Sequence, residues 1–147
     1  MRPESKRVFR YAVSLAKQYD AKMLMLYVME PLGELGRELI KKYLPDEMVD
    51  KVHDEGVTSI IKEIRQRVTR FYTEELEALG HKIDVQIDPL VVEGRHVASI
   101  LEQAEAHNVD LIVMGNNHKR SSQTVNRVVK KSKIPVTVVQ MGKDLGY

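Results

Sequence analysis

The chain has no cysteine and no tryptophan among its 147 residues, and aromatic residues make up only 5% of it. Without cysteine it forms no disulfide and has no thiolate to act as metal ligand or nucleophile, which suits a reducing compartment. No apolar run approaches the roughly 20 residues needed to cross a bilayer. The basic residues near the start are followed by no apolar segment of the kind that a secretory signal requires. We therefore expect a cytoplasmic protein without membrane insertion.

Acidic residues are scarce at the C-terminal end. Residues 116–147 contain seven Lys or Arg and one acid, Asp144, whereas residues 1–115 contain 16 bases and 20 acids, so the net charge of +2 conceals two unlike regions. A basic surface of this kind attracts phosphates or nucleic acid. No aromatic residue lies among these bases, which disfavours nucleic-acid binding and favours a solvated helix face.

The spacing of apolar residues predicts alternating helices and strands in a single domain. Helices are expected over 5–19, over one long segment 46–79 that stops at Gly80 and that Gly56 either interrupts or leaves continuous, over a segment that ends at Asn108, and from Ser121 or Ser122. The last helix carries Val125, Val128 and Val129, with its basic residues outward. Strands are expected over 21–29, 83–88, 111–114 and 135–141, and the alternation of apolar and polar residues over 83–88 indicates a half-exposed strand near a sheet edge. Strict alternation predicts an α/β fold, an open parallel sheet with right-handed crossovers and helices on both faces.

Residues 91–115 are the most informative stretch. Their apolar spacing predicts a helix that ends at Asn108, a residue tolerant of left-handed backbone geometry. The continuous apolar run over 111–114 predicts a buried parallel strand. Gly115 would then allow a sharp turn at the carboxyl end of that strand, where open α/β sheets bind their ligands.

On residues 21–28, 91–94, 109–115 and 122–139, the chain resembles the universal stress protein family, with Arg127-Val128 and Ile134-Pro135-Val136 at the family's spacing. The resemblance implies a three-layer sandwich like that of the adenine-nucleotide alpha-hydrolases, with five parallel strands in the order 3-2-1-4-5. It also implies a homodimer joined through the last strand, which here comprises Pro135, Val136, Thr137, Val138 and Val139. Many members of the family bind ATP, and others have lost this property.

The first departure from the family is at the start of the chain. The family begins with an apolar strand in the middle of the sheet, whereas here only residues 1–4 precede the first predicted helix. Without it, the flanking strands would lie about 10 Å apart and leave buried backbone groups unpaired, at roughly 1–3 kcal/mol each. Three repairs are open: a native start further upstream, which we favour; direct pairing of the flanking strands; or a strand lent by a partner chain.

The second departure is in the nucleotide loop. Members that bind ATP carry glycine, two residues, glycine, nine residues, glycine, and then serine or threonine. Here Gly115 holds the first place and His118 the second, while Ser122 and Gln123 stand where the third glycine and the hydroxyl residue belong. The loop is also six residues shorter, so family-type ATP binding is expected to be lost or weakened.

This loop still has the chemistry of a weak anion site, because a capped helix N-terminus, hydroxyls and cations favour phosphate. The alternative is an ordinary polar loop. If nucleotide or phosphate binding is retained, the expected residues are Gly115, Asn116, His118, Ser121, Ser122 and Gln123, with ATP or AMP as weak ligands.

No metal site and no catalytic residue are expected. The histidines fall on separate elements without ligand-like spacing: His53, His81, His96, His107 and His118. His96 is interpreted as a residue at the start of a helix. No nucleophile elbow, P-loop or dinucleotide fingerprint occurs.

The sequence thus favours a non-enzymatic, homodimeric regulatory or stress-response protein of the universal stress type. Two alternatives remain: a nucleotide-binding protein or weak ATP hydrolase, and an accessory domain that docks on a transporter or another protein through its basic helix. Nucleic acid is a weaker fourth possibility.

Overall fold

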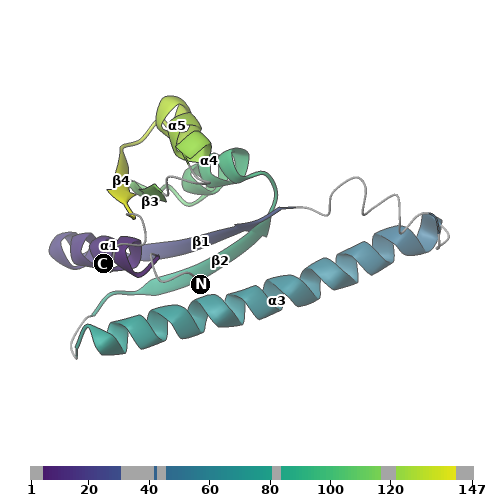
Figure 1. Cartoon of the computed structure of the whole chain (residues 1–147), viewed down its shortest axis with the longest axis horizontal. Coiled ribbons are helices and arrows are strands. Elements are labelled where there is room, and N and C mark those ends of the chain that lie inside the picture. Colours follow the sequence, from purple (N-terminus) through teal and green to yellow (C-terminus); the bar gives the residue numbers. More distant parts are fainter. Residues whose placement is uncertain (1–4, 31–41, 43–45, 81–83, 117–121, 142–147) are drawn as a thin grey trace.

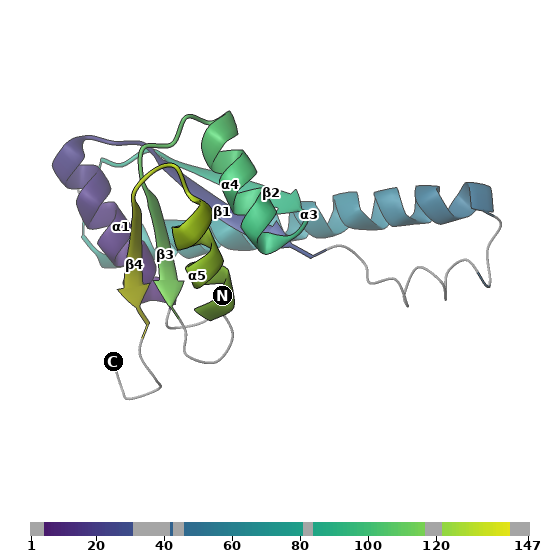
Figure 2. The same ribbon diagram turned by 90° about the horizontal axis from the view of Figure 1, so that it is seen from above.

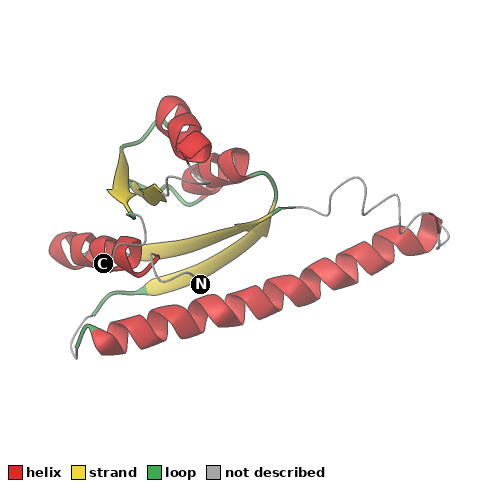
Figure 3. Cartoon of the chain, in the orientation of Figure 1, coloured by secondary structure: helices red, strands yellow, loops and turns green. Residues whose placement is uncertain are grey.

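The computed structural model describes residues 5–30, 42, 46–80, 84–116 and 122–141 (Figure 1). Within them the order of elements is α1 (Ser5–Tyr19), β1 (Met23–Met29), α3 (Asp46–Ala78), β2 (Ile87–Glu93), α4 (His96–Ala106), β3 (Ile112–Asn116), α5 (Ser122–Lys131) and β4 (Val136–Gln140). Helices and strands alternate along this order, and the paired strands are parallel, which confirms the α/β class (Figure 3). No helix of this described part is long and apolar enough to span a bilayer.

The described strands form two separate parallel pairs. β1 pairs with β2 from Met23↔Ile87 to Met29↔Glu93, and β3 pairs with β4 from Ile112↔Val136 to Asn116↔Gln140. β1 and β3 are not hydrogen-bonded to each other. Figures 1 and 2 show β3 and β4 running across the direction of β1 and β2. The expected alternative in which these two strands pair directly with each other is therefore wrong.

The main apolar core lies between α1, α3 and the β1–β2 pair. Phe9 is buried in α1, and its ring meets Phe71 of α3 edge-on, with ring centroids 5.5 Å apart. The other members of this core are Val13, Ala16, Val85 and Ile87, with Met23, Met25, Tyr72, Leu76 and Leu79 packed against them. The helical period of α1 thus places its apolar stripe on the sheet.

The second strand differs from the prediction. Alternation over 83–88 predicted a half-exposed strand, but β2 begins only at Ile87 and continues through Pro89. Burial does alternate, since Val85 and Ile87 are buried whereas Asp84 and Gln86 are exposed. Among the described strands β2 pairs only with β1, and such an edge tolerates a proline that donates no hydrogen bond.

The predicted helix ends are confirmed. Asn108 has a φ of 51° just after α4, and Gly80 has a φ of 101° just after α3, so both adopt the left-handed geometry of a helix terminus. α3 continues through Gly56 without a break, so of the two possibilities left open at this glycine the uninterrupted helix is the one observed. The grouping of Val129 with the inward valines of α5 is wrong, since Val129 is 50% exposed whereas Val125 and Val128 are buried.

Candidate functional site

Gly115 does not make the sharp turn predicted for it. It lies inside β3, paired with Val139, and the strand continues to Asn116. A Cβ on Gly115 would collide with the Sδ of Met141 and lie 2.7 Å from Cγ2 of Val8. Glycine therefore allows Val8 of α1 and Met141, the residue after β4, to pack closely against β3. This close packing, and not a turn, accounts for a glycine at this position.

Asn116 is the polar side chain at the carboxyl end of β3. Its Nδ2 donates a hydrogen bond to Oε1 of Gln140, with 3.0 Å between the two atoms, and its backbone oxygen accepts from the amide of Met141. The Oδ1 of Asn116 is buried and has no hydrogen-bond partner in the described part of the chain. A buried acceptor without a partner is unusual and marks this end of β3 as a candidate position for a hydrogen-bond donor.

The remaining predicted phosphate-site residues are only partly placed. α5 begins at Ser122, as the capping pattern predicted, and Gln123 is exposed on its first turn. His118, Ser121 and the side chain of Ser122 lie outside the described residues. The structure thus brings Gly115 and Asn116 together on β3 and leaves the rest of the site as a prediction.

A second group of polar residues lies at the carboxyl ends of β1 and β2. Oε1 of Glu30 is 3.2 Å from Nδ1 of His96, and the amide of Gly94 donates to the carbonyl of Met29. A Cβ on Gly94 would lie 2.5 Å from Oγ of Ser99, which is buried in α4. The interpretation of His96 as the first residue of a helix is confirmed. Its contact with Glu30 was missed, because only the fold brings the two residues together.

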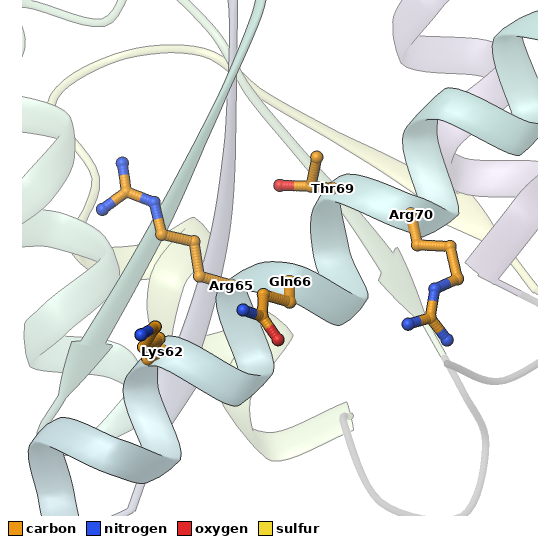
Figure 4. A pocket seen from close by; sticks show the side chains of 5 residues that line it. All are labelled: Lys62, Arg65, Gln66, Thr69 and Arg70. Carbon is orange, nitrogen blue, oxygen red and sulfur yellow. The ribbon is translucent and has the colours of Figure 1, made fainter.

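Two hollows of the described surface lie along α3. Both are shallow and share Lys62, and the first is lined by Lys62, Arg65, Gln66, Thr69 and Arg70 (Figure 4). Because all these residues come from one helix, the hollow is a strip of open basic surface. Among the described residues no group of three or more His, Asp or Glu is placed to hold a metal ion.

Known proteins resemble the chain over almost its whole length. The sequence pattern of the universal stress protein family matches residues 2–140. The universal stress protein MJ0531 of Methanocaldococcus jannaschii is 26% identical over 140 residues, which cover 91% of this chain and 74% of that protein.

Two solved structures share the fold. A universal stress protein in complex with cAMP superposes with a TM-score of 0.59 at 18% identity, covering 96% of this chain and 91% of that one. The universal stress protein from Archaeoglobus fulgidus in complex with dAMP gives a TM-score of 0.58 at 16% identity, covering 94% and 89%. At these sequence identities the two structures establish only the fold. The family is established by the sequence match, which covers residues 2–140. On that match, the chain belongs to the universal stress protein family.

Proposed function

We propose that the protein is a non-enzymatic stress-response or regulatory protein in which family-type ATP binding is lost or weakened. The packing of Gly115 carries this proposal. In the ATP-binding pattern the first glycine opens a loop whose backbone approaches the phosphates, whereas here it lies within a strand, with Val8 and Met141 against it. A backbone covered by side chains on that side leaves less room for a triphosphate.

Calorimetric titration with ATP, AMP, cAMP and dAMP tests this proposal. We expect no measurable heat, or dissociation constants weaker than tens of micromolar, which corresponds to less than about 6 kcal/mol of binding free energy. A dissociation constant below about 1 μM for ATP would contradict it.

An adenine nucleotide bound without family-type phosphate contacts is the second candidate. Two relatives of the same fold were solved with cAMP and with dAMP, which carry one phosphate each. The Oδ1 of Asn116, which has no partner among the described residues, is an acceptor of the kind that a ribose hydroxyl or an adenine amino group would satisfy. Heat from cAMP or dAMP that is lost in Asn116→Ala would favour this candidate, and phosphate release from ATP would favour a hydrolase.

We further propose that the protein is a homodimer joined through β4. This strand pairs with β3 on one side only, and no other described strand pairs with it. Val136, Thr137 and Val138 are half-buried, and an open apolar edge of this kind is stabilised by pairing with a second copy. Hydrogen exchange of the β4 amides should slow as protein concentration rises through the micromolar range. Exchange that is independent of concentration, together with a monomer in sedimentation, would contradict the β4 dimer.

A further inference from the structure

α3 extends well beyond the body of the fold. Its 33 residues span about 50 Å at 1.5 Å per residue. Its C-terminal half packs beneath β1 and β2, where Val68 is 1% exposed, whereas its N-terminal half projects past the ends of those strands (Figures 1 and 2). Ile60, near the middle of the helix, is 47% exposed.

One stripe of this helix combines an exposed isoleucine with a glycine. Gly56, Ile60 and Ile64 are spaced four residues apart and therefore lie on one face of α3. Glycine destabilises a helix interior relative to alanine, yet α3 continues through Gly56. A Cβ at this position would meet no atom within 4 Å. No packing contact within the described part of the chain requires this glycine, whereas the close approach of another helix would.

Charge along α3 changes sign on either side of Ile60. In the sequence, residues 46–55 contain five acids and one base, and residues 62–70 contain four bases and one acid. A second copy of the helix in antiparallel orientation would place the acidic part of each copy beside the basic part of the other. A parallel copy would place like charges together, which costs free energy.

We propose that α3 is a self-association surface on which a second copy of this chain docks through its own α3, antiparallel, with Ile60 close to the two-fold axis. In this register Gly56 faces the partner's Ile64, so that the side chain fills the space that the glycine leaves. Glu55 faces the partner's Arg65. The surface lies on a different element from β4 and goes beyond the dimer proposed above.

Disulfide cross-linking provides a clean test, because these 147 residues contain no cysteine. Helix axes about 8–10 Å apart bring facing Cα atoms within the range of roughly 4.4–6.8 Å that a disulfide requires. We expect Ile60→Cys to form a covalent dimer under mild oxidation at micromolar concentration. Ser59→Cys, an exposed neighbour about 100° away around the helix, is the matched control and should cross-link at least tenfold more slowly. Equal rates for the two variants would overturn the proposal.

A substitution at the glycine gives an independent readout. Gly56→Leu improves helix propensity but fills the space intended for the partner's side chain, so it should weaken self-association at least tenfold without loss of helical content in circular dichroism. Gly56→Ala adds only a methyl group and should weaken association less. An unchanged dissociation constant in Gly56→Leu would overturn the antiparallel register. In a chain that no longer dimerises through β4, the Ile60→Cys cross-link should persist, which separates the failure of one interface from that of the other.

Discussion

The two strand pairs of this protein differ in what holds them. The β1–β2 pair extends over seven residue pairs and packs against α1 and α3, with a shared apolar core that includes Phe9 and Ile87. The β3–β4 pair extends over five residue pairs. The buried side chains of this part of the molecule, such as Val139 of β4 and Val128 of the neighbouring helix α5, do not belong to that core. The first pair is the scaffold. The second carries the candidate phosphate site and the proposed dimer edge, so function is assigned to the smaller of the two pairs.

The largest expected effect is in the scaffold. Phe9→Ala removes a buried ring that contacts Phe71, and it should lower the free energy of unfolding by about 3–5 kcal/mol. Chemical denaturation measures this loss. Tyr19→Ala removes an aromatic ring that is 72% exposed on the same helix, and it should change stability by less than about 0.5 kcal/mol. A loss below about 1 kcal/mol in Phe9→Ala would show that the scaffold core is looser than its packing indicates.

The second effect probes the smaller pair through two adjacent valines of α5. Val128 is completely buried, and Val128→Ala should cost about 1–3 kcal/mol, because methyl groups leave a packed environment. Val129 is half-exposed, and Val129→Ala should cost less than about 0.5 kcal/mol. Amide hydrogen exchange then sharpens the comparison. If the pairs open independently, Val128→Ala speeds exchange in β3 and β4 and leaves β1 and β2 unchanged, and a uniform increase would show one cooperative unit.

The third effect is at Gly115, where the candidate site and the packing meet. Gly115→Ala places a methyl group against Met141 and Val8 and should destabilise the fold by about 1–3 kcal/mol. Met141→Ala removes one of the two obstacles, so the double variant should recover part of the loss, a coupling that a double-mutant cycle measures. If Gly115→Ala is as stable as the natural chain, close packing is not the reason for the glycine.

Local patterns in the sequence predicted the elements better than their assembly. Asn108 and Gly80 were identified as helix ends because left-handed geometry is a property of single residues, and the apolar face of α1 follows from its period. The separation of β1 from β3 depends on pairing between distant segments, which no local pattern contains.

The role of Gly115 was misjudged for a similar reason. Its neighbours Val8 and Met141 come from the opposite ends of the chain, so the sequence indicated a turn where the structure has a packed strand. The contact of Glu30 with His96 was missed because it too joins distant segments.

The smallest expected effects come from removing ion pairs and side-chain hydrogen bonds, first in the scaffold and then in the β3–β4 pair. In the scaffold, Glu75 of α3 is buried, and its carboxylate lies 3.0 Å from Nε of Arg10 and 3.4 Å from Nζ of Lys6, both on α1. Both cations are half-exposed, which screens the interaction, so Glu75→Gln should cost only about 1–2 kcal/mol.

The matched control for this change is on the surface of the same helix. Glu63 pairs with Arg67 one turn later, with both side chains well exposed, and Glu63→Gln should lower the free energy of unfolding by about 0.3–0.5 kcal/mol.

The corresponding contact in the β3–β4 pair is the exposed hydrogen bond between Asn116 and Gln140, and Gln140→Ala should lower the free energy of unfolding by no more than about 0.5 kcal/mol. Unfolding measured at low and at high salt distinguishes these contacts, since the ion pairs of Glu75 and Glu63 should weaken as salt screens them, whereas the hydrogen bond of Gln140 should not. Equal losses in Glu75→Gln and Gln140→Ala would mean that α1 and α3 are held together by their apolar contacts alone.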